Sequence, residues 1–114
     1  SFGETLHVRL RYFDPERGRA GIPEDVGALI ESLKDDEVVV KLVNTSPVHP
    51  RTLIVQAGAY AEHQFTSVTN DAGDEIALND SSFRVKLAPG TGTSLTLKMQ
   101  RYQNPPTFIF PWDR

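Results

Sequence analysis

The sequence predicts an all-β protein, an antiparallel β-sandwich of about seven or eight strands with one short helix near residues 23–34. Most of the chain consists of short runs rich in β-branched and aromatic residues, separated by clusters of Gly, Pro, Asn and Asp. The length of 114 residues is typical of a single domain, which can bury roughly two thirds of the surface exposed by its unfolded chain. We therefore expect one folded domain over residues 1–114.

The N-terminal third predicts one strand and the helix. Over residues 6–12 apolar side chains alternate with polar ones, including His7, which is the pattern of a half-exposed strand. The period then changes. Val26, Leu29, Ile30 and Leu33 recur at helical spacing, and proline and acidic residues precede them as they do in a first helical turn. We expect this helix to pack its apolar stripe on a sheet.

The middle of the chain predicts two central strands, because residues 38–43 and 52–57 are apolar on both faces. Between them lies NTSPVHP, which combines turn-forming residues with His49. This stretch is interpreted as a strand connection. Proline flanks the histidine on both sides, and no acidic residue is spaced to orient the imidazole as a catalytic base.

The second half of the chain predicts two hairpins and a last strand. Residues 83–87 and 94–99 alternate cleanly and are joined by APGTGT, a turn of hairpin length. The segments AYAEHQFTSV and DEIAL are joined by TNDAG, which predicts a second hairpin. The ending TFIFPW is expected to form a strand that neighbouring prolines confine to the edge of a sheet.

Composition excludes several function classes. The formal net charge is −3, so the chain lacks the basic patch that binds nucleic acid, and no nucleic-acid partner is expected. There is no cysteine, hence no disulfide, thiolate nucleophile or thiolate metal site. No apolar run approaches the roughly 20 residues of a membrane helix. Because the chain begins with serine and has no signal-peptide pattern, we expect the C-terminal part of a longer protein, although a processed or tagged chain could also begin in this way. Its compartment stays open.

No catalytic residue, metal site or cofactor is predicted. His63 is adjacent to Glu62, and on a strand adjacent side chains point to opposite faces, so the two cannot act as an acid/base pair. His63 is expected to be half-buried and satisfied by a neighbouring polar group. The acidic residues cluster in turns, and NDAGDE lacks the alternation and the distal glutamate of a calcium-binding loop.

The aromatic residues provide the candidate binding site. Tyr60, Tyr102 and Trp112 are candidate carbohydrate-binding residues if they form an exposed stacking platform. The alternative is that the C-terminal aromatics belong to the core or dock on another domain, because Phe108, Phe110 and Trp112 would share one face of a strand.

Two stretches carry a resemblance to a known class of domain. VVVKLVNTS (residues 38–46) and the strand, turn and strand of SSFRVKLAPGTGTSLTLKM resemble the C-terminal β-sandwich domains that follow the catalytic barrel in many bacterial glycoside hydrolases. The resemblance covers about a quarter of the chain and implies a domain without a catalytic residue of its own.

Three hypotheses follow for function. The first is a non-catalytic accessory domain that packs on and stabilises an upstream, carbohydrate-active domain of the same polypeptide. The second is a carbohydrate-binding module that uses exposed aromatic side chains. The third, a small enzyme that uses His49 or His63, requires a pocket with convergent polar groups.

Overall fold

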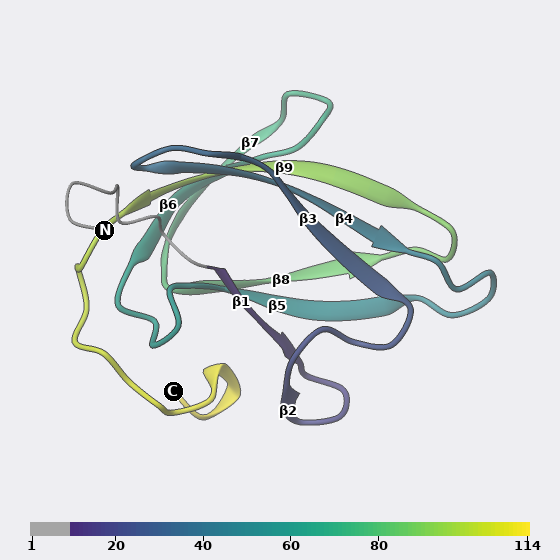
Figure 1. The fold of residues 1–114 in the computed structure, drawn as a ribbon, viewed down its shortest axis with the longest axis horizontal. Helices are drawn as coiled ribbons and strands as arrows, with labels where there is room; N and C mark the ends of the chain where they lie inside the picture. Colours follow the sequence, from purple (N-terminus) through teal and green to yellow (C-terminus); the bar gives the residue numbers. More distant parts are fainter. Residues whose placement is uncertain (1–9) are drawn as a thin grey trace, which may run out of the picture.

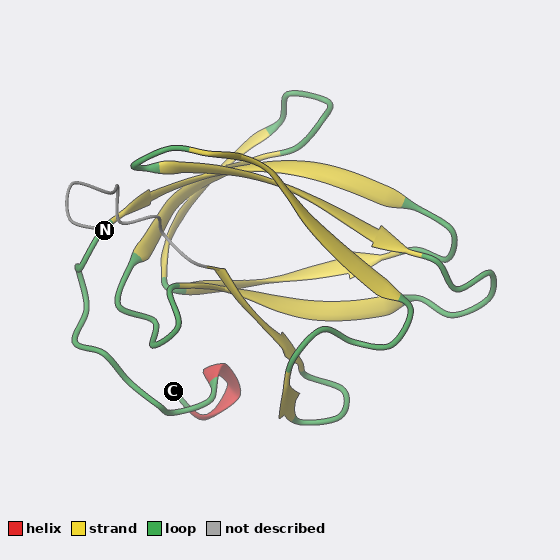
Figure 2. Ribbon diagram, viewed as in Figure 1, coloured by secondary structure: helices red, strands yellow, loops and turns green. Residues whose placement is uncertain are grey.

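The computed structural model describes residues 10–114, and over this range the chain is the all-β sandwich that the sequence predicts (Figure 1; Figure 2). Nine strands form two antiparallel sheets, one of four strands and one of five. Helical structure in the described range is limited to one 3-10 turn, η1 (Pro111–Asp113). Figure 1 shows the two sheets stacked face to face, with the C-terminal segment running below the four-stranded sheet.

The five-stranded sheet has the strand order β3-β4-β9-β6-β7. Its strands are β3 (Val26–Leu33), β4 (Glu37–Asn44), β6 (Gln64–Thr69), β7 (Glu75–Asp80) and β9 (Gly92–Gln100). β4 lies between β3 and β9, which confirms it as a central strand, whereas β3 and β7 are the two edges.

The four-stranded sheet has the strand order β2-β1-β5-β8. Its strands are β1 (Leu10–Asp14), β2 (Arg19–Ala20), β5 (Arg51–Ala57) and β8 (Ser82–Leu87). β5 is central, as predicted, and β8 is an edge. The first predicted strand is confirmed from Leu10 onward, while its residues 6–9, including His7, lie outside the described residues.

Inward-facing side chains of both sheets form one core. The predicted alternation is confirmed in β8 and β9: Leu95, Leu97 and Met99 are buried, and Phe83 and Val85 pack partly buried against the same cluster. The fully covered members of this core are Val38, Val40, Leu42, Leu53, Val55, Ala57, Phe65 and Leu97.

The predicted helix near residues 23–34 is wrong: this segment forms β3, paired antiparallel with β4. Val26, Ala28 and Ile30 lie opposite inward-facing residues of β4, but the register shifts between Ile30 and Ser32, so Leu33 also lies opposite a buried valine. This β-bulge brings residues 30 and 33 to the same face. Together with the exposed Leu29 it produces the apolar spacing that imitates a helix.

One predicted hairpin is confirmed and the other is wrong. β6 and β7 pair antiparallel around the TNDAG turn. β8, however, pairs with β5 in one sheet, whereas β9 pairs with β4 and β6 in the other. The APGTGT stretch therefore crosses between the sheets, because a turn sequence specifies a change of direction and not the partner of the next strand.

Two predicted strand segments are irregular. In AYAEHQFTSV the strand begins only at Gln64, and the preceding residues form a turn in which Ala61 has a positive φ of 57°. TFIFPW forms no strand either; it is extended chain followed by η1. The prolines at positions 105, 106 and 111 explain this second difference, since each removes a backbone donor that a strand requires.

Candidate functional site

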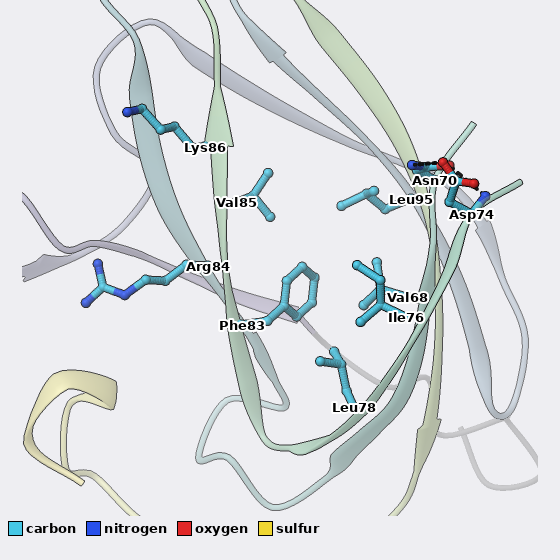
Figure 3. Close-up of a pocket in the computed structure, with 10 residues that line it drawn as sticks. All are labelled: Val68, Asn70, Asp74, Ile76, Leu78, Phe83, Arg84, Val85, Lys86 and Leu95. Carbon is cyan, nitrogen blue, oxygen red and sulfur yellow. Dashed lines mark hydrogen bonds between the residues drawn. The ribbon is translucent and has the colours of Figure 1, made fainter. Parts of the chain in front are cut away.

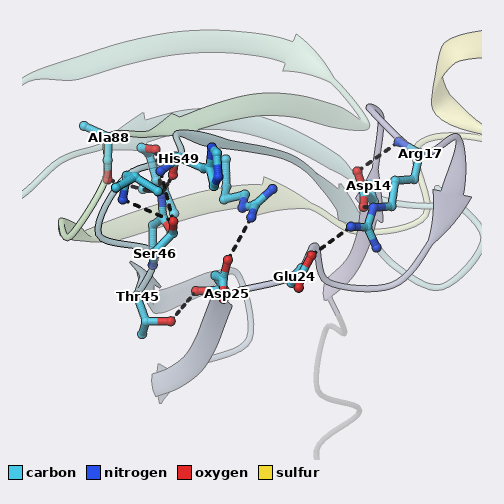
Figure 4. Close-up of polar contacts among 12 residues, drawn as sticks. Asp14, Arg17, Glu24, Asp25, Thr45, Ser46, His49 and Ala88 are labelled. Carbon is cyan, nitrogen blue, oxygen red and sulfur yellow. Dashed lines mark hydrogen bonds and ion pairs between the residues drawn. The ribbon is translucent and has the colours of Figure 1, made fainter.

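The NTSPVHP stretch is a cross-sheet connection organised by the buried Asn44. Figure 4 shows Ser46 and His49 of this stretch close to Ala88, which follows β8. The Asn44 Nδ2 donates to the backbone carbonyls of His49, Leu87 and Ala88 at 2.8, 3.1 and 3.3 Å. Its Oδ1 accepts the Ser46 amide at 3.0 Å. One side chain thus joins the connection after β4 to the connection after β8, which confirms the interpretation of this stretch as a turn between strands.

His49 is exposed at the surface of this turn. Its backbone amide donates to the Ser46 Oγ at 2.9 Å, and its carbonyl accepts from Asn44. Within residues 10–114 these backbone bonds are its polar contacts, and no acid orients the imidazole. The arrangement supplies no partner for general base catalysis.

His63 is buried, with a relative exposure of 5%, rather than half-buried as predicted. Its Nδ1 accepts a hydrogen bond from the Tyr102 amide at 3.0 Å. The Tyr102 ring packs edge-on against the imidazole, with the two ring centroids 4.7 Å apart. Burial lowers the pKa of His63, and Arg101 lowers it further, while Glu62 raises it. The bond to Nδ1 places the proton of the neutral ring on Nε2. The predicted satisfaction by a polar neighbour is confirmed.

The three candidate carbohydrate-binding aromatics lie in separate contacts. Tyr60 packs edge-on against Phe108 with ring centroids 5.0 Å apart, and Tyr102 packs against His63. Trp112 stacks on Phe110 with ring centroids 4.9 Å apart. Tyr60 and Tyr102 are 42% and 64% exposed, and Trp112 is half-buried. Their carbohydrate-binding role stays a prediction, but these three rings do not form one shared platform in the described chain.

The C-terminal segment covers the outer face of the four-stranded sheet. Phe13 and Ile54 are register partners on this face, and Phe13 contacts both Phe110 and Trp112 edge-on at 5.9 Å. The Arg114 guanidinium bonds to the Gln56 side chain and to the Ser81 Oγ. Burial lowers the pKa of Arg114, and the nearby Asp80 opposes that shift. This cover explains why β5 is apolar on both faces.

The same segment presents apolar side chains to solvent. We name Tyr60, Phe108, Ile109 and Phe110 the aromatic ledge; their exposures are 42%, 85%, 55% and 38%. The Thr107 amide donates to the Tyr60 carbonyl at 2.8 Å, which ties the two parts of the ledge together. Strand alternation predicts that Phe108 shares one face with Trp112, but in the structure Phe108 is exposed and Trp112 is half-buried. The flanking prolines are the sequence feature that contradicts a strand.

A polar pocket of about 390 Å³ is lined in part by Ala61 and Thr107, the chain neighbours of Tyr60 and Phe108 in the aromatic ledge. It is lined by Gln64, Asn79, Asp80, Asn104 and Arg114, among others. Most of these groups already bond within the protein: Gln64 donates to Asn79, and the Asn104 Nδ2 donates to the His63 carbonyl at 3.2 Å. The pocket is therefore a preorganised surface of amide, carboxylate and guanidinium groups.

The described residues contain no group of three or more His, Asp or Glu side chains placed to hold a metal ion. In NDAGDE, the Asn70 Oδ1 instead accepts the amides of Ala72 and Asp74 at 3.0 and 2.9 Å, which stabilises the hairpin turn. Across residues 10–114 there is no helix with the length and apolar character needed to cross a membrane.

Comparison with protein-family models, curated proteins and solved structures finds no match to this chain. Its function must therefore be inferred from the arrangement of its own residues.

Proposed function

We propose that this chain is a non-catalytic accessory domain that docks, through the aromatic ledge, on a neighbouring domain of the same polypeptide. The observation that carries the proposal is the exposure of Phe108 and Ile109, at 85% and 55%, on a segment otherwise fixed to the sandwich. Exposed apolar side chains gathered in one patch favour an interface, since single scattered ones are common on any surface.

The segment is also rigid enough to serve as an interface. Prolines 105, 106 and 111 restrict its backbone, and Trp112 and Arg114 anchor its end on the four-stranded sheet. A surface that is ordered before binding loses less conformational entropy when it docks. Aromatic side chains are enriched in the centres of protein interfaces.

Hydrogen exchange tests the proposal. We expect the amides of residues 107–110 to exchange more slowly in the full-length polypeptide than in the isolated chain. The variant with Phe108→Asp and Ile109→Asp should abolish that difference without unfolding the isolated chain. Leu29→Asp is the matched control, because Leu29 is 62% exposed on β3, away from the ledge. Equal exchange in both contexts, or a reading frame that encodes this chain alone, would contradict the proposal.

A second candidate function is carbohydrate binding, favoured by the polar pocket whose lining includes Ala61 and Thr107, the chain neighbours of Tyr60 and Phe108. Planar amide and carboxylate groups can bond to sugar hydroxyls, and an adjacent aromatic ring can stack on a sugar face. Cellohexaose, xylohexaose and mannohexaose are suitable probes for NMR titration. Binding lost in Tyr60→Ala and retained in Tyr102→Ala would support this function, whereas no spectral change with any of the probes would argue against it.

A further inference from the structure

An open apolar cleft lies between the two sheets on the side where β7 and β8 are the edge strands (Figure 3). The two strands are consecutive in the chain and are separated only by Ser81, so one corner joins the edge of one sheet to the edge of the other. In the described chain β7 pairs only with β6, and β8 pairs only with β5. Both strands therefore have one side without a strand partner.

The cleft exposes side chains that face the core. Ile76 lies opposite the buried Val68 in the register of β6 and β7, which places it on the inner face, yet it is 63% exposed. Figure 3 shows Phe83 and Val85 of β8 pointing across the cleft toward Ile76. The cavity measures about 340 Å³, and its wall is apolar between these two strands. An apolar group that enters the cleft would therefore lie against core-facing side chains of both sheets.

The outer face of β8 carries positive charge. Arg84 and Lys86 are exposed, share this face and point away from the cleft (Figure 3). Their register partners on β5 are Ile54 and Thr52, which are uncharged. Within residues 10–114, neither cation takes part in an ion pair. A strand added beside β8 would place side chains directly opposite them, where acidic residues are favourable.

We propose that the free edge of β8 is a strand-addition site for an extended segment of a partner protein in which apolar and acidic residues alternate. The backbone of the segment pairs with β8. Its apolar side chains enter the cleft beside Phe83 and Val85, and its acidic side chains lie against Arg84 and Lys86. Main-chain pairing supplies affinity in this mode of recognition, and the alternating side chains supply specificity. The proposal is independent of docking at the aromatic ledge.

NMR titration of the isotope-labelled chain tests the proposal with a capped peptide, Ser-Val-Glu-Val-Glu-Val-Ser. We expect shifts and slower exchange in the amides of β8. Replacing both glutamates of the peptide with lysine should weaken binding about tenfold, since like charges then face each other. A scrambled peptide, Ser-Val-Val-Glu-Glu-Val-Ser, should also bind more weakly because its alternation is lost.

A charge swap provides the matched control. The variant with Arg84→Glu and Lys86→Glu changes only exposed side chains, so it should keep the native spectrum and prefer the lysine peptide. Ile76→Glu should weaken the binding of the glutamate peptide and of the lysine peptide alike, because it introduces a charge into the apolar cleft. Absence of binding by the glutamate peptide would overturn the proposal and leave Arg84 and Lys86 as charges that protect an edge. Equal binding of all three peptides would overturn it as well.

Discussion

The Asn44 side chain donates a hydrogen bond to the Leu87 carbonyl, 3.1 Å away and 43 positions later in the chain. Asn44 ends β4 in one sheet, and Leu87 ends β8 in the other. Both residues are buried, so the bond lies where water cannot replace it. A single amide therefore fixes the position of two cross-sheet connections relative to each other.

Asn44→Ala should lower the free energy of unfolding by about 2 to 4 kcal/mol, because it leaves buried carbonyls and the Ser46 amide without partners. Urea denaturation of the variant and the native chain measures this difference. Asn79→Ala is the matched control, since Asn79 is exposed and, within residues 10–114, its side chain bonds only to the Gln64 side chain. The control should change stability by less than about 1 kcal/mol. A similar loss in both variants would show that burial of the Asn44 network contributes little.

The strands of this fold are predictable from the sequence where every second residue faces the core. β9 has this alternation without interruption, and its boundaries are predicted within two residues. β3 does not. Its bulge after Ile30 and the exposed Leu29 give the spacing of an amphipathic helix, although a glycine at position 27 is unfavourable inside a helix. A bulge depends on the partner strand, so its position is not contained in the local sequence.

Residues that act through distant contacts were the hardest to predict. The Pro89-Gly90 turn indicated a reversal of the chain, but the pairing of β8 with β5 is decided by packing across the whole sandwich. Arg114 could not be assigned a role, because its partner Gln56 is 58 positions away. For the candidate site, the sequence indicated Tyr60 and the importance of the C-terminal aromatics, but not which of them are exposed.

Trp112→Ala should destabilise the chain by about 1 to 2 kcal/mol, because the half-buried indole covers Phe13 on the four-stranded sheet. Phe108→Ala should change stability by less than about 0.5 kcal/mol, since its ring is 85% exposed. Thermal melts followed by circular dichroism compare the two variants without relying on tryptophan fluorescence. If Phe108→Ala were the more destabilising change, the assignment of Trp112 to the fold and of Phe108 to the ledge would be reversed.

Stability should fall as the pH decreases below about 6.5, in part because of His63. Burial lowers the pKa of folded His63 from its ordinary value of 6.5, so the unfolded chain binds a proton more readily. The contribution of His63 is therefore fully present above pH 6.5 and is lost as the pH falls toward the lowered pKa of the folded state. Protonation of Nδ1 would also break the bond from the Tyr102 amide.

His63→Asn isolates this contribution, because the amide oxygen can accept the Tyr102 bond and does not titrate. Urea denaturation at about pH 7.5 and about pH 5 should show a smaller loss of stability in this variant than in the native chain. His49→Asn is the control; His49 is exposed, so the native pH dependence should be retained. The same pH dependence in native and His63→Asn chains would show that other groups account for it.

Gly58→Ala should destabilise the chain more than Gly73→Ala, although both glycines have similar positive φ values of 92° and 86°. Alanine at either position costs about 1 to 2 kcal/mol, because residues with a Cβ disfavour the left-handed backbone conformation. At Gly73 an added Cβ meets nothing within 4 Å, whereas at Gly58 it overlaps the Glu62 carboxylate and lies 2.9 Å from the His63 Cδ2. Moving Glu62 would also break its bond from the Tyr60 amide, now 3.0 Å. The difference in unfolding free energy between the two variants measures the close packing of this turn, and equal losses would mean that Glu62 and His63 move aside without cost.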